Sequence, residues 1–342
     1  MSFSRPRQGV AIEINPRHVL VAGLGNWQER PLEIESIQEF DREDRDGLRH
    51  WLRERHEKTF APALVSFYPA GRILHRDSLV PRRLAEPDYL PDFAREKFAI
   101  ANPAEWHLHL LHPLEGEPIE AEGAQRPVLI SAMPHAAVRE IQQWLLDFNL
   151  MPYRLEVGTL PLLGSIFRLN ESRSDTRATV VVEIEESHTT VAILGKEGVH
   201  TPAPVKQGFD SLIAAARREF DLPDDAAARE FLRHTSEDLD TRARRLVRAL
   251  ARELKPVINS YELTTGQRIG ELYCSFLSRA TAWVGPALAG AMDLEPFPIN
   301  CDEWHVDVQL RATPGLKLPP HWFPLLSLLA GTAAGAPHGE PA

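Results

Sequence analysis

Cysteines and long apolar runs are both scarce in this sequence. Only Cys274 and Cys301 occur in 342 residues. Two thiols make no disulfide framework, which favours a reducing compartment such as the cytosol. The longest apolar tract, residues 322–336, contains Pro324 and is shorter than the roughly 20 residues that span a bilayer. Residues 1–16 lack the apolar core of a signal peptide. We therefore expect a cytoplasmic protein without direct membrane insertion, which a partner would hold at a membrane.

Positive charge is also in deficit. The chain has 38 Lys and Arg against 48 Asp and Glu, a formal net charge of −10. This balance argues against nucleic acid as a partner and against a basic membrane-surface patch. Arg242, Arg245, Arg248 and Arg252 form a basic stripe on an expected helix, which we interpret as a solvated face. The length exceeds the usual limit of about 250 to 300 residues for one core, so two or more domains are expected.

Two similar stretches organise what is present. Residues 178–194 contain an apolar run ending in Glu183-Ile-Glu185, a polar turn and a second apolar run. Residues 9–22 repeat this order, with Glu13-Ile-Asn15 before a turn at Pro16-Arg17. Both stretches are typical of β-hairpins. A spacing near 170 residues is too long for a solenoid and favours two related domains in tandem.

The segment between the two copies predicts a small inserted α+β unit. Its expected elements are a strand at 72–80, a helix at 86–100, strands at 105–112 and 127–132, and a helix at 134–150. A further strand is expected at 151–157. After the second copy, residues 237–260 predict a long helix that Pro256 should kink or end early. Residues 298–300 and 304–308 predict short extended pieces, and residues 319–335 a final apolar helix.

Three stretches carry a resemblance to a known family: residues 63–81, 91–106 and 150–157. With the order of elements, they resemble the actin-like superfamily, and more narrowly the PilM-like family of type IV pilus assembly and its type II secretion counterparts. The resemblance implies an α/β fold with duplicated actin-like (ribonuclease H-like) domains and an inserted small subdomain. The implied boundaries are residues 1–70 with 153–175 for the first domain, 71–152 for the insertion, 176–336 for the second domain, and 337–342 for a disordered tail.

The nucleotide loops of that family are eroded in this chain. The family's two phosphate loops have Asp-Ile-Gly, where this sequence has Glu13-Ile-Asn15 and Glu183-Ile-Glu185. Its adenosine loop has Ser-Gly-Gly, where this sequence has Ser275-Phe276-Leu277. Glycine lets a backbone approach phosphate oxygens, and Glu185 adds bulk and negative charge there. The resemblance therefore implies a pseudo-ATPase without a cofactor, whose degenerate nucleotide site lies at Glu13, Asn15, Glu183, Glu185, Gly208 and Ser275.

Two other groups of residues have the side chains of metal ligands. Glu13, Glu183 and Glu185 could form a displaced magnesium site, but strand-end carboxylates in an empty cleft are the simpler interpretation. His107 and His109 could ligate zinc, but no cysteine is near and no fourth ligand is evident. Neither pattern predicts a metal.

The function implied by the resemblance is that of a non-catalytic scaffold. It would lie under the inner-membrane platform of a pilus or secretion system and bind the cytoplasmic N-terminal peptide of a PilN-like membrane protein. The rival hypothesis is an active ATPase or sugar-kinase relative that uses ATP and magnesium; a cell-division actin-like protein is a weaker third. The peptide is expected at the inserted subdomain, with strand 127–132 as a pairing edge. The expected contacts are Arg72, Leu74, Arg76, Leu79, Phe93 and Phe98. For any one of the apolar residues, however, the simpler interpretation is that it fills the subdomain's own core.

Overall fold

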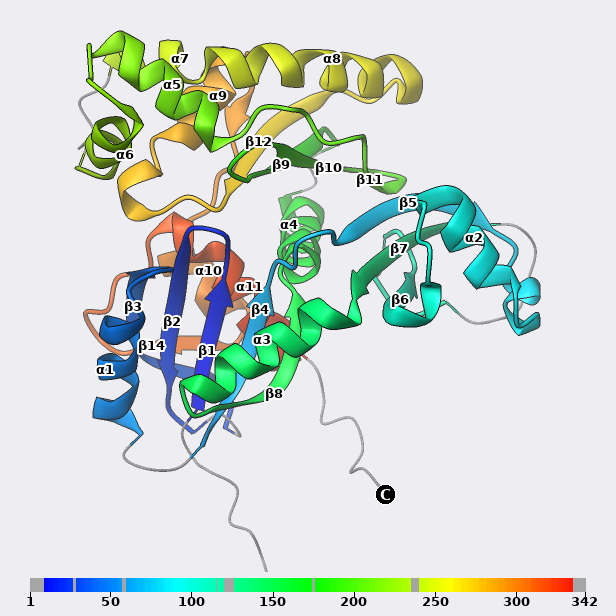
Figure 1. The fold of residues 1–342 in the computed structure, drawn as a ribbon, viewed down its shortest axis with the longest axis horizontal. Helices are drawn as coiled ribbons and strands as arrows, with labels where there is room; N and C mark the ends of the chain where they lie inside the picture. Colours follow the sequence, from blue (N-terminus) through cyan, green and yellow to red (C-terminus); the bar gives the residue numbers. More distant parts are fainter. Residues whose placement is uncertain are drawn as a thin grey trace, which may run out of the picture.

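Three β-sheets organise the part of the chain that the computed structural model describes, which is residues 9–26, 29–56, 60–114, 116–119, 126–173, 176–234 and 240–334. A six-stranded sheet has the order β14-β3-β2-β1-β4-β8, a five-stranded sheet the order β11-β10-β9-β12-β13, and a three-stranded sheet the order β5-β7-β6. We call these sheets, with the helices on them, the first unit, the second unit and the lobe. The lobe projects to one side of the two larger units (Figure 1). The expected tail, residues 337–342, lies outside the described residues.

The first unit is a sheet with helices on both faces. Its strands are β1 (Gly9–Ile14), β2 (His18–Leu24), β3 (Leu32–Asp41), β4 (Ala61–Phe67), β8 (Leu150–Val157) and β14 (Leu310–Ala312). Alternating β1 side chains face opposite ways, as the two-residue period of a strand requires. Val10 and Ile12 pack with α1 (Arg45–Arg55) and α3 (His135–Asp147). Ala11 packs into the core that holds α4 (Thr159–Arg173), α10 (Cys301–Asp307) and α11 (Phe323–Ala334).

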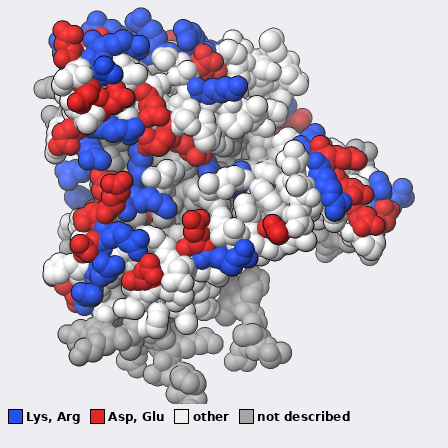
Figure 2. All heavy atoms as spheres, in the orientation of Figure 1, with Lys and Arg blue, Asp and Glu red and all other residues white. Residues whose placement is uncertain are grey.

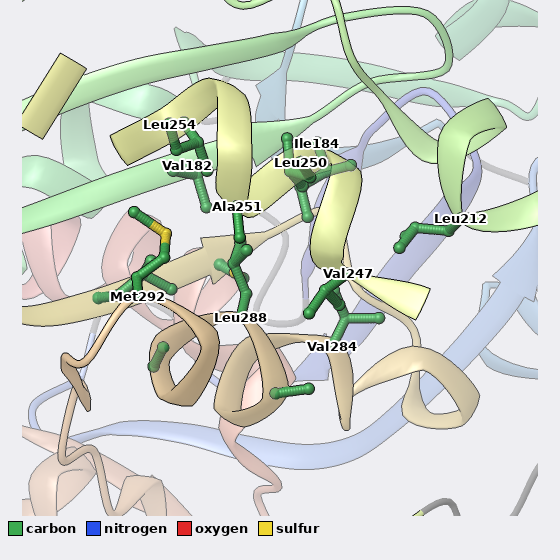
Figure 3. Close-up of a cluster of buried hydrophobic side chains, with 14 of the residues drawn as sticks. Val182, Ile184, Leu212, Val247, Leu250, Ala251, Leu254, Val284, Leu288 and Met292 are labelled. Carbon is green, nitrogen blue, oxygen red and sulfur yellow. The ribbon is translucent and has the colours of Figure 1, made fainter. Parts of the chain in front are cut away.

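The second unit repeats this plan. Its strands are β9 (Ala178–Ile184), β10 (Thr189–Gly195), β11 (Gly198–His200), β12 (Ile269–Ser275) and β13 (Glu295–Pro296). One face packs with α5 (Phe209–Glu219), α7 (Asp240–Leu246), α8 (Arg248–Thr265) and α9 (Val284–Ala291), and α6 (Asp225–His234) packs on α5. Figure 3 shows this core, where Leu254 of α8 lies beside Val182 of β9 and Leu250 lies beside Ile184. The other face joins the core around α4 and α11.

The two hairpins predicted from the sequence lie in different sheets, as expected. β1 pairs antiparallel with β2 and parallel with β4. β9 pairs antiparallel with β10 and parallel with β12. The strand orders β3-β2-β1-β4 and β11-β10-β9-β12 therefore correspond, so the two sheets share the topology expected of duplicated domains.

The lobe is a three-stranded sheet covered on one face by a helix. It contains β5 (Ile73–Leu79), β6 (Trp106–Leu111), β7 (Arg126–Pro134) and α2 (Tyr89–Phe98). Leu79, Val128 and Ile130 form its small core with residues of α2. On the opposite face, Leu129 packs into the core around α4, so the lobe is fastened to the body of the molecule.

Two segments pack differently from the expected boundaries. Helix α3 was expected in the inserted unit, but its Ile141 and Leu145 pack on the first sheet. The C-terminal segment was expected in the second unit, but β14 pairs with β3 and α11 contacts α4, β1 and β4. Helix α11 is apolar over almost its whole length, so it is stable only where neighbours surround it, between the two sheets. Whether the units fold as separate domains stays a prediction.

Local structure also departs from the sequence pattern at two places. The expected long helix breaks at Val247, whereas α8 continues through Pro256 to Thr265. Pro256 and Arg252, whose carbonyl loses its helical donor, are both exposed, so water can satisfy that carbonyl. Residues 304–308 were expected to be extended, but Cys301 and Trp304 lie one helical turn apart and are both buried in α10. The side chain of Asn300 accepts a hydrogen bond from the Asp302 amide and caps this helix.

Within the described ranges, every helix is too short or too polar to cross a lipid bilayer.

Candidate functional site

A cleft of about 2270 Å³ opens between the first and second units. The β1–β2 turn, with Arg17, lines it from the first unit. Glu186 of the β9–β10 turn, Phe209 of α5 and Ser278 beyond β12 line it from the second. The two hairpin turns therefore face one another, and the expected degenerate site is built at their meeting point.

Arg17 crosses the gap between the two units. Its Nη1 donates to the carbonyl oxygen of Ile184 at 2.9 Å, and its Nη2 donates to the carbonyl oxygen of Phe276. The guanidinium carbon lies 4.2 Å from the centroid of the Phe209 ring, a favourable cation–π distance. Burial lowers the pKa of Arg17 to about 10, so the side chain stays charged at neutral pH. A cation of this protein thus occupies the place between the turns.

Asn15 shapes the first turn from within. Its Oδ1 accepts hydrogen bonds from the backbone amides of Arg17 (3.0 Å) and His18 (2.9 Å). Its Nδ2 lies 2.7 Å from Nε2 of His18. Burial lowers the pKa of His18 to about 3, so this imidazole is neutral. The amides that a phosphate loop would present to an anion are therefore bonded to the turn's own side chain.

The second turn closes the N-terminus of α5 in a similar way. The amides of Phe209 and Asp210 donate to the carbonyl oxygens of Glu185 (2.7 Å) and Glu186 (2.9 Å). Gly208 makes this approach possible, since a Cβ there would lie 2.5 Å from both carbonyl oxygens. The free amides of a helix N-terminus are a ready anion site, but two of these are already satisfied by carbonyls.

Glu183 and Glu185 are joined by one arginine. Nη2 of Arg72 lies 2.7 Å from a carboxylate oxygen of Glu183 and 2.8 Å from one of Glu185. Glu183 also accepts a 2.6 Å hydrogen bond from the Thr159 hydroxyl. Arg72 precedes β5, so this contact ties the entrance of the lobe to the second unit. Charge-assisted bonds of this kind are the stronger class of hydrogen bond.

Glu13 is the carboxyl group at the floor of the first unit. It is only 1% exposed, and its Oε2 has no hydrogen-bond partner among the described residues. Burial raises the pKa of Glu13 to about 8, and the nearby charge of Glu183 adds to the effect. The group is therefore largely protonated at neutral pH, because a buried neutral acid costs less than a buried anion.

Ser275 is the last residue of β12 and pairs with Glu183 of β9, and Phe276 and Leu277 follow the strand. Phe276 has a left-handed backbone with φ of 63°, a conformation that is costly for a bulky residue and easy for glycine. Its ring is 2% exposed and meets Tyr68 edge-on, with 4.4 Å between ring centroids. The loop therefore keeps the backbone that glycine would provide, while an aromatic side chain fills the interior.

The structure brings the six expected degenerate-site residues together around the two hairpin turns. They are Glu13, Asn15, Glu183, Glu185, Gly208 and Ser275. The contact made by Arg72 was missed, because a residue distant in sequence from both glutamates gives no local pattern. In the ranges the structure covers, no group of three or more His, Cys, Asp or Glu side chains is arranged to hold a metal ion. His107 and His109 lie on the lobe with ring centroids 6.5 Å apart.

The six expected partner contacts do not form one surface. Arg72 bonds within the cleft, and Leu74 packs toward the core around α4. The backbone amide of Arg76 donates to the hydroxyl of Thr201 at 2.9 Å, at the junction with the second unit. The remaining three side chains contribute to the lobe's own core: Leu79, Phe93 and Phe98. This packing agrees with the simpler interpretation of Leu79, Phe93 and Phe98, and whether Phe93 and Phe98, which are half-buried, also contact a partner stays a prediction.

The pairing edge was also placed on the wrong strand. β7 lies between β5 and β6 and is bonded on both sides. Among the described residues, the outer edge of β6 carries no strand from Trp106 to His109, whereas Leu111 bridges to Pro118. His107 and His109 pair with Met133 and Ser131 of β7, and His107 contacts His135, with ring centroids 4.0 Å apart. The polar–apolar alternation of residues 106–110 was the signal for this half-exposed strand.

No family model and no curated protein matches the sequence. Among solved structures, a PilM–PilN type IV pilus biogenesis complex matches with a TM-score of 0.67 and 18% identity, covering 96% of this chain and 100% of that chain. The chain therefore has the actin-like fold expected from the sequence.

Two further solved structures match more weakly. The ethanolamine utilization protein EutJ from Carboxydothermus hydrogenoformans has a TM-score of 0.46 and 10% identity, covering 95% of this chain and 90% of that chain. The cytoplasmic domain of EpsL, an inner-membrane component of the type II secretion system of Vibrio cholerae, has a TM-score of 0.42 and 10% identity, covering 95% and 94%.

Proposed function

We propose that this chain is a PilM-like scaffold that binds an extended peptide of a PilN-like inner-membrane protein and uses no nucleotide cycle. The observation that carries the proposal is Arg17, which fills the space between the two turns and bonds the second unit through two backbone carbonyls. In an actin-like ATPase, nucleotide would bridge the two units. Here the protein's own side chains supply that bridge, so closure of the cleft does not require a ligand.

Three features oppose binding of ATP and magnesium. Asn15 and the carbonyls of Glu185 and Glu186 already satisfy the amides of both loops. The carboxylates of Glu183 and Glu185 are held by Arg72 rather than left free for a cation. Phe276 fills the space beside Tyr68. A phosphate would have to displace these contacts and would lie close to Glu185, a repulsion of a few kcal/mol at an intermediate dielectric.

The lobe offers the partner a free strand edge. β6 can accept an extended peptide as a fourth strand, because its main-chain groups from 106 to 109 face no other strand among the described residues. Side chains of the peptide would then alternate, and one set would lie along the face of His107 and His109. A protein of this fold with a membrane-anchored partner would be held peripherally at the inner membrane, on its cytoplasmic side.

The peptide site can be tested with a double substitution. His107→Ala with His109→Ala removes the side chains beside the edge, and we expect at least tenfold weaker binding of the synthetic N-terminal peptide of the PilN-like protein by fluorescence anisotropy. His50→Ala is the matched control, since His50 is exposed on α1 of the first unit. Equal affinity for the double variant and the wild type would place the peptide elsewhere.

The absence of a nucleotide cycle can be tested separately. Calorimetric titration of the wild-type protein with ATP and magnesium should give no heat above dilution, and ATP should not be hydrolysed. Micromolar binding, equivalent to about −8 kcal/mol, would instead favour the active ATPase or sugar-kinase relative.

A further inference from the structure

The outer face of α8 carries a row of cations that the proposed function does not use. Arg248, Arg252 and Lys255 follow one another at helical spacings of four and three residues, so they lie along one side of the helix. All three are exposed. The opposite side of α8 is buried through Leu250, Leu254 and other residues of the second core, which fixes the cationic side outward.

The same row ends in an exposed leucine. Leu263 lies eleven residues after Arg252, which is about three helical turns and places it on the same side of α8. Leu263 is 85% exposed, the highest value among the large hydrophobic residues described as exposed. A row of cations with an apolar side chain at one end is complementary to a lipid leaflet, which has anionic headgroups at its surface and apolar chains beneath them.

The acidic side chains near this row leave its charge largely available. Arg252 lies 3.6 Å from Glu253 and is 76% exposed. Lys255 lies 3.8 Å from Asp293, which is 91% exposed. Such exposed pairs are weak and exchange readily for other anions. The Glu262 carboxylate accepts from the Ile269 amide and is engaged there, and Arg248 has no ion-pair partner among the residues described.

Helix α8 also has the position that such a contact needs. It runs along the outer edge of the second unit, on the side away from the first sheet (Figure 1). Figure 2 shows Lys and Arg side chains at the left part of that upper edge, with Asp and Glu side chains among them. The net charge of −10 does not oppose a local contact, because exposed charges farther away than a Debye length of about 8 to 10 Å are largely screened.

From these observations we infer that the exposed side of α8, formed by Arg248, Arg252, Lys255 and Leu263, is a docking surface for anionic lipid headgroups. The cations would pair with headgroup phosphates, and Leu263 would enter the interface among them. The contact is peripheral and reversible, and it would orient the second unit toward the leaflet. It does not depend on the peptide site or on nucleotide, so its failure would leave the proposed function untouched.

Vesicle co-sedimentation of the full chain tests this surface. We expect binding to vesicles of phosphatidylcholine and phosphatidylglycerol (3:1) at low salt, little binding to pure phosphatidylcholine, and release at high salt. Arg248→Glu with Arg252→Glu should lower the partition coefficient at least tenfold, since each basic residue near an anionic leaflet contributes about fivefold. Leu263→Ala should lower it several-fold.

The control carries the same change in net charge at a distance from α8. Arg53→Glu with Arg311→Glu alters exposed residues of α1 and β14 and should leave vesicle binding unchanged. Circular dichroism would confirm that every variant is folded. The inference is overturned if the wild type fails to bind phosphatidylglycerol vesicles at low salt. It is also overturned if both double variants lose binding equally, because net charge and not this surface would then be responsible.

Discussion

Arg72, at the entrance to the lobe, lies 2.7 Å from Glu183 on β9 of the second unit. The arginine side chain is 9% exposed and the glutamate side chain 2%, so the pair is shielded from water. The same guanidinium also reaches Glu185. A contact between the inserted lobe and the floor of the second unit thus joins two parts of the chain that are more than 100 residues apart in sequence.

Removing Arg72 should destabilise the protein strongly. Arg72→Ala leaves Glu183 and Glu185 without their cation in a shielded site, and breaking a buried pair from one side costs about 3–5 kcal/mol. Urea denaturation measures this free energy of unfolding. The control is Arg83→Ala on the lobe surface, whose pair with Glu86 is exposed and whose loss should not change the midpoint. Similar midpoints for the two variants would contradict the structural role of Arg72.

Stability should fall as the pH rises from about 6.5 to 8. The folded protein keeps the Glu13 proton up to about pH 8, whereas an unfolded glutamate, whose pKa is about 4.5, releases it well below neutral pH. The folded state therefore binds more protons in this interval, and the free energy of unfolding decreases with pH. His18, whose pKa is lowered by burial to about 3, acts in the opposite direction only below about 6.5.

Glu13→Gln isolates this effect, because the amide resembles the protonated acid at every pH. We expect the variant to lose the decline between pH 6.5 and 8 and to exceed the wild type in stability at pH 8. Thermal unfolding across this range is the measurement. Parallel pH profiles for the two proteins would show that Glu13 is already ionised in the folded state.

Phe276 allows a matched comparison of two small replacements. Phe276→Ala and Phe276→Gly both remove a buried ring, and the loss of such a ring to alanine costs about 3–5 kcal/mol of stability. Phe276→Gly also relieves the positive φ of 63°, which costs a residue with a Cβ about 1–2 kcal/mol. The glycine variant should therefore be more stable than Phe276→Ala by about 1 kcal/mol in urea denaturation. An alanine variant that equals or exceeds it in stability would contradict the left-handed backbone.

Gly208→Ala should lower the stability of the protein. A Cβ at Gly208 would lie 2.5 Å from the carbonyl oxygens of Glu185 and Glu186, and relieving such a clash costs about 1–3 kcal/mol. At Gly164 in α4, no atom lies within 4 Å of an added Cβ, so Gly164→Ala should be neutral or stabilising through helix propensity. Thermal denaturation of both variants should separate them by several degrees, and equal melting temperatures would show that the second turn does not cap α5.

The sequence predicted the strands and hairpins of this fold better than the packing of its elements against one another. Both hairpins and the strands of the lobe carry local apolar patterns, and the structure confirms them. The helix was expected to kink or end early at Pro256, but it continues. The free-energy cost of a proline inside a helix depends on whether the carbonyl that loses its donor reaches water, which the sequence does not reveal. Helix α10 was missed because its burial comes from α11, which is close only in space.

The candidate site shows the same limit. Asn15, Glu185 and Phe276 could be identified as departures from a nucleotide loop, since they replace residues with a known geometric task. That Arg17 and Arg72 fill the resulting space depends on side chains crossing between units that are far apart in sequence. The apolar partner contacts stay a prediction, because a small lobe needs the same apolar residues for its own core and sequence does not show which of them remain exposed.

The most direct test of the central claim measures peptide affinity with and without nucleotide. The N-terminal cytoplasmic peptide of the PilN-like protein would be titrated into the wild-type chain by calorimetry, first without nucleotide and then with ATP and magnesium in excess. The account predicts binding of equal affinity in the two titrations, because Arg17 and Arg72 already join the units. Binding that appears, or strengthens tenfold, only with ATP and magnesium would contradict it.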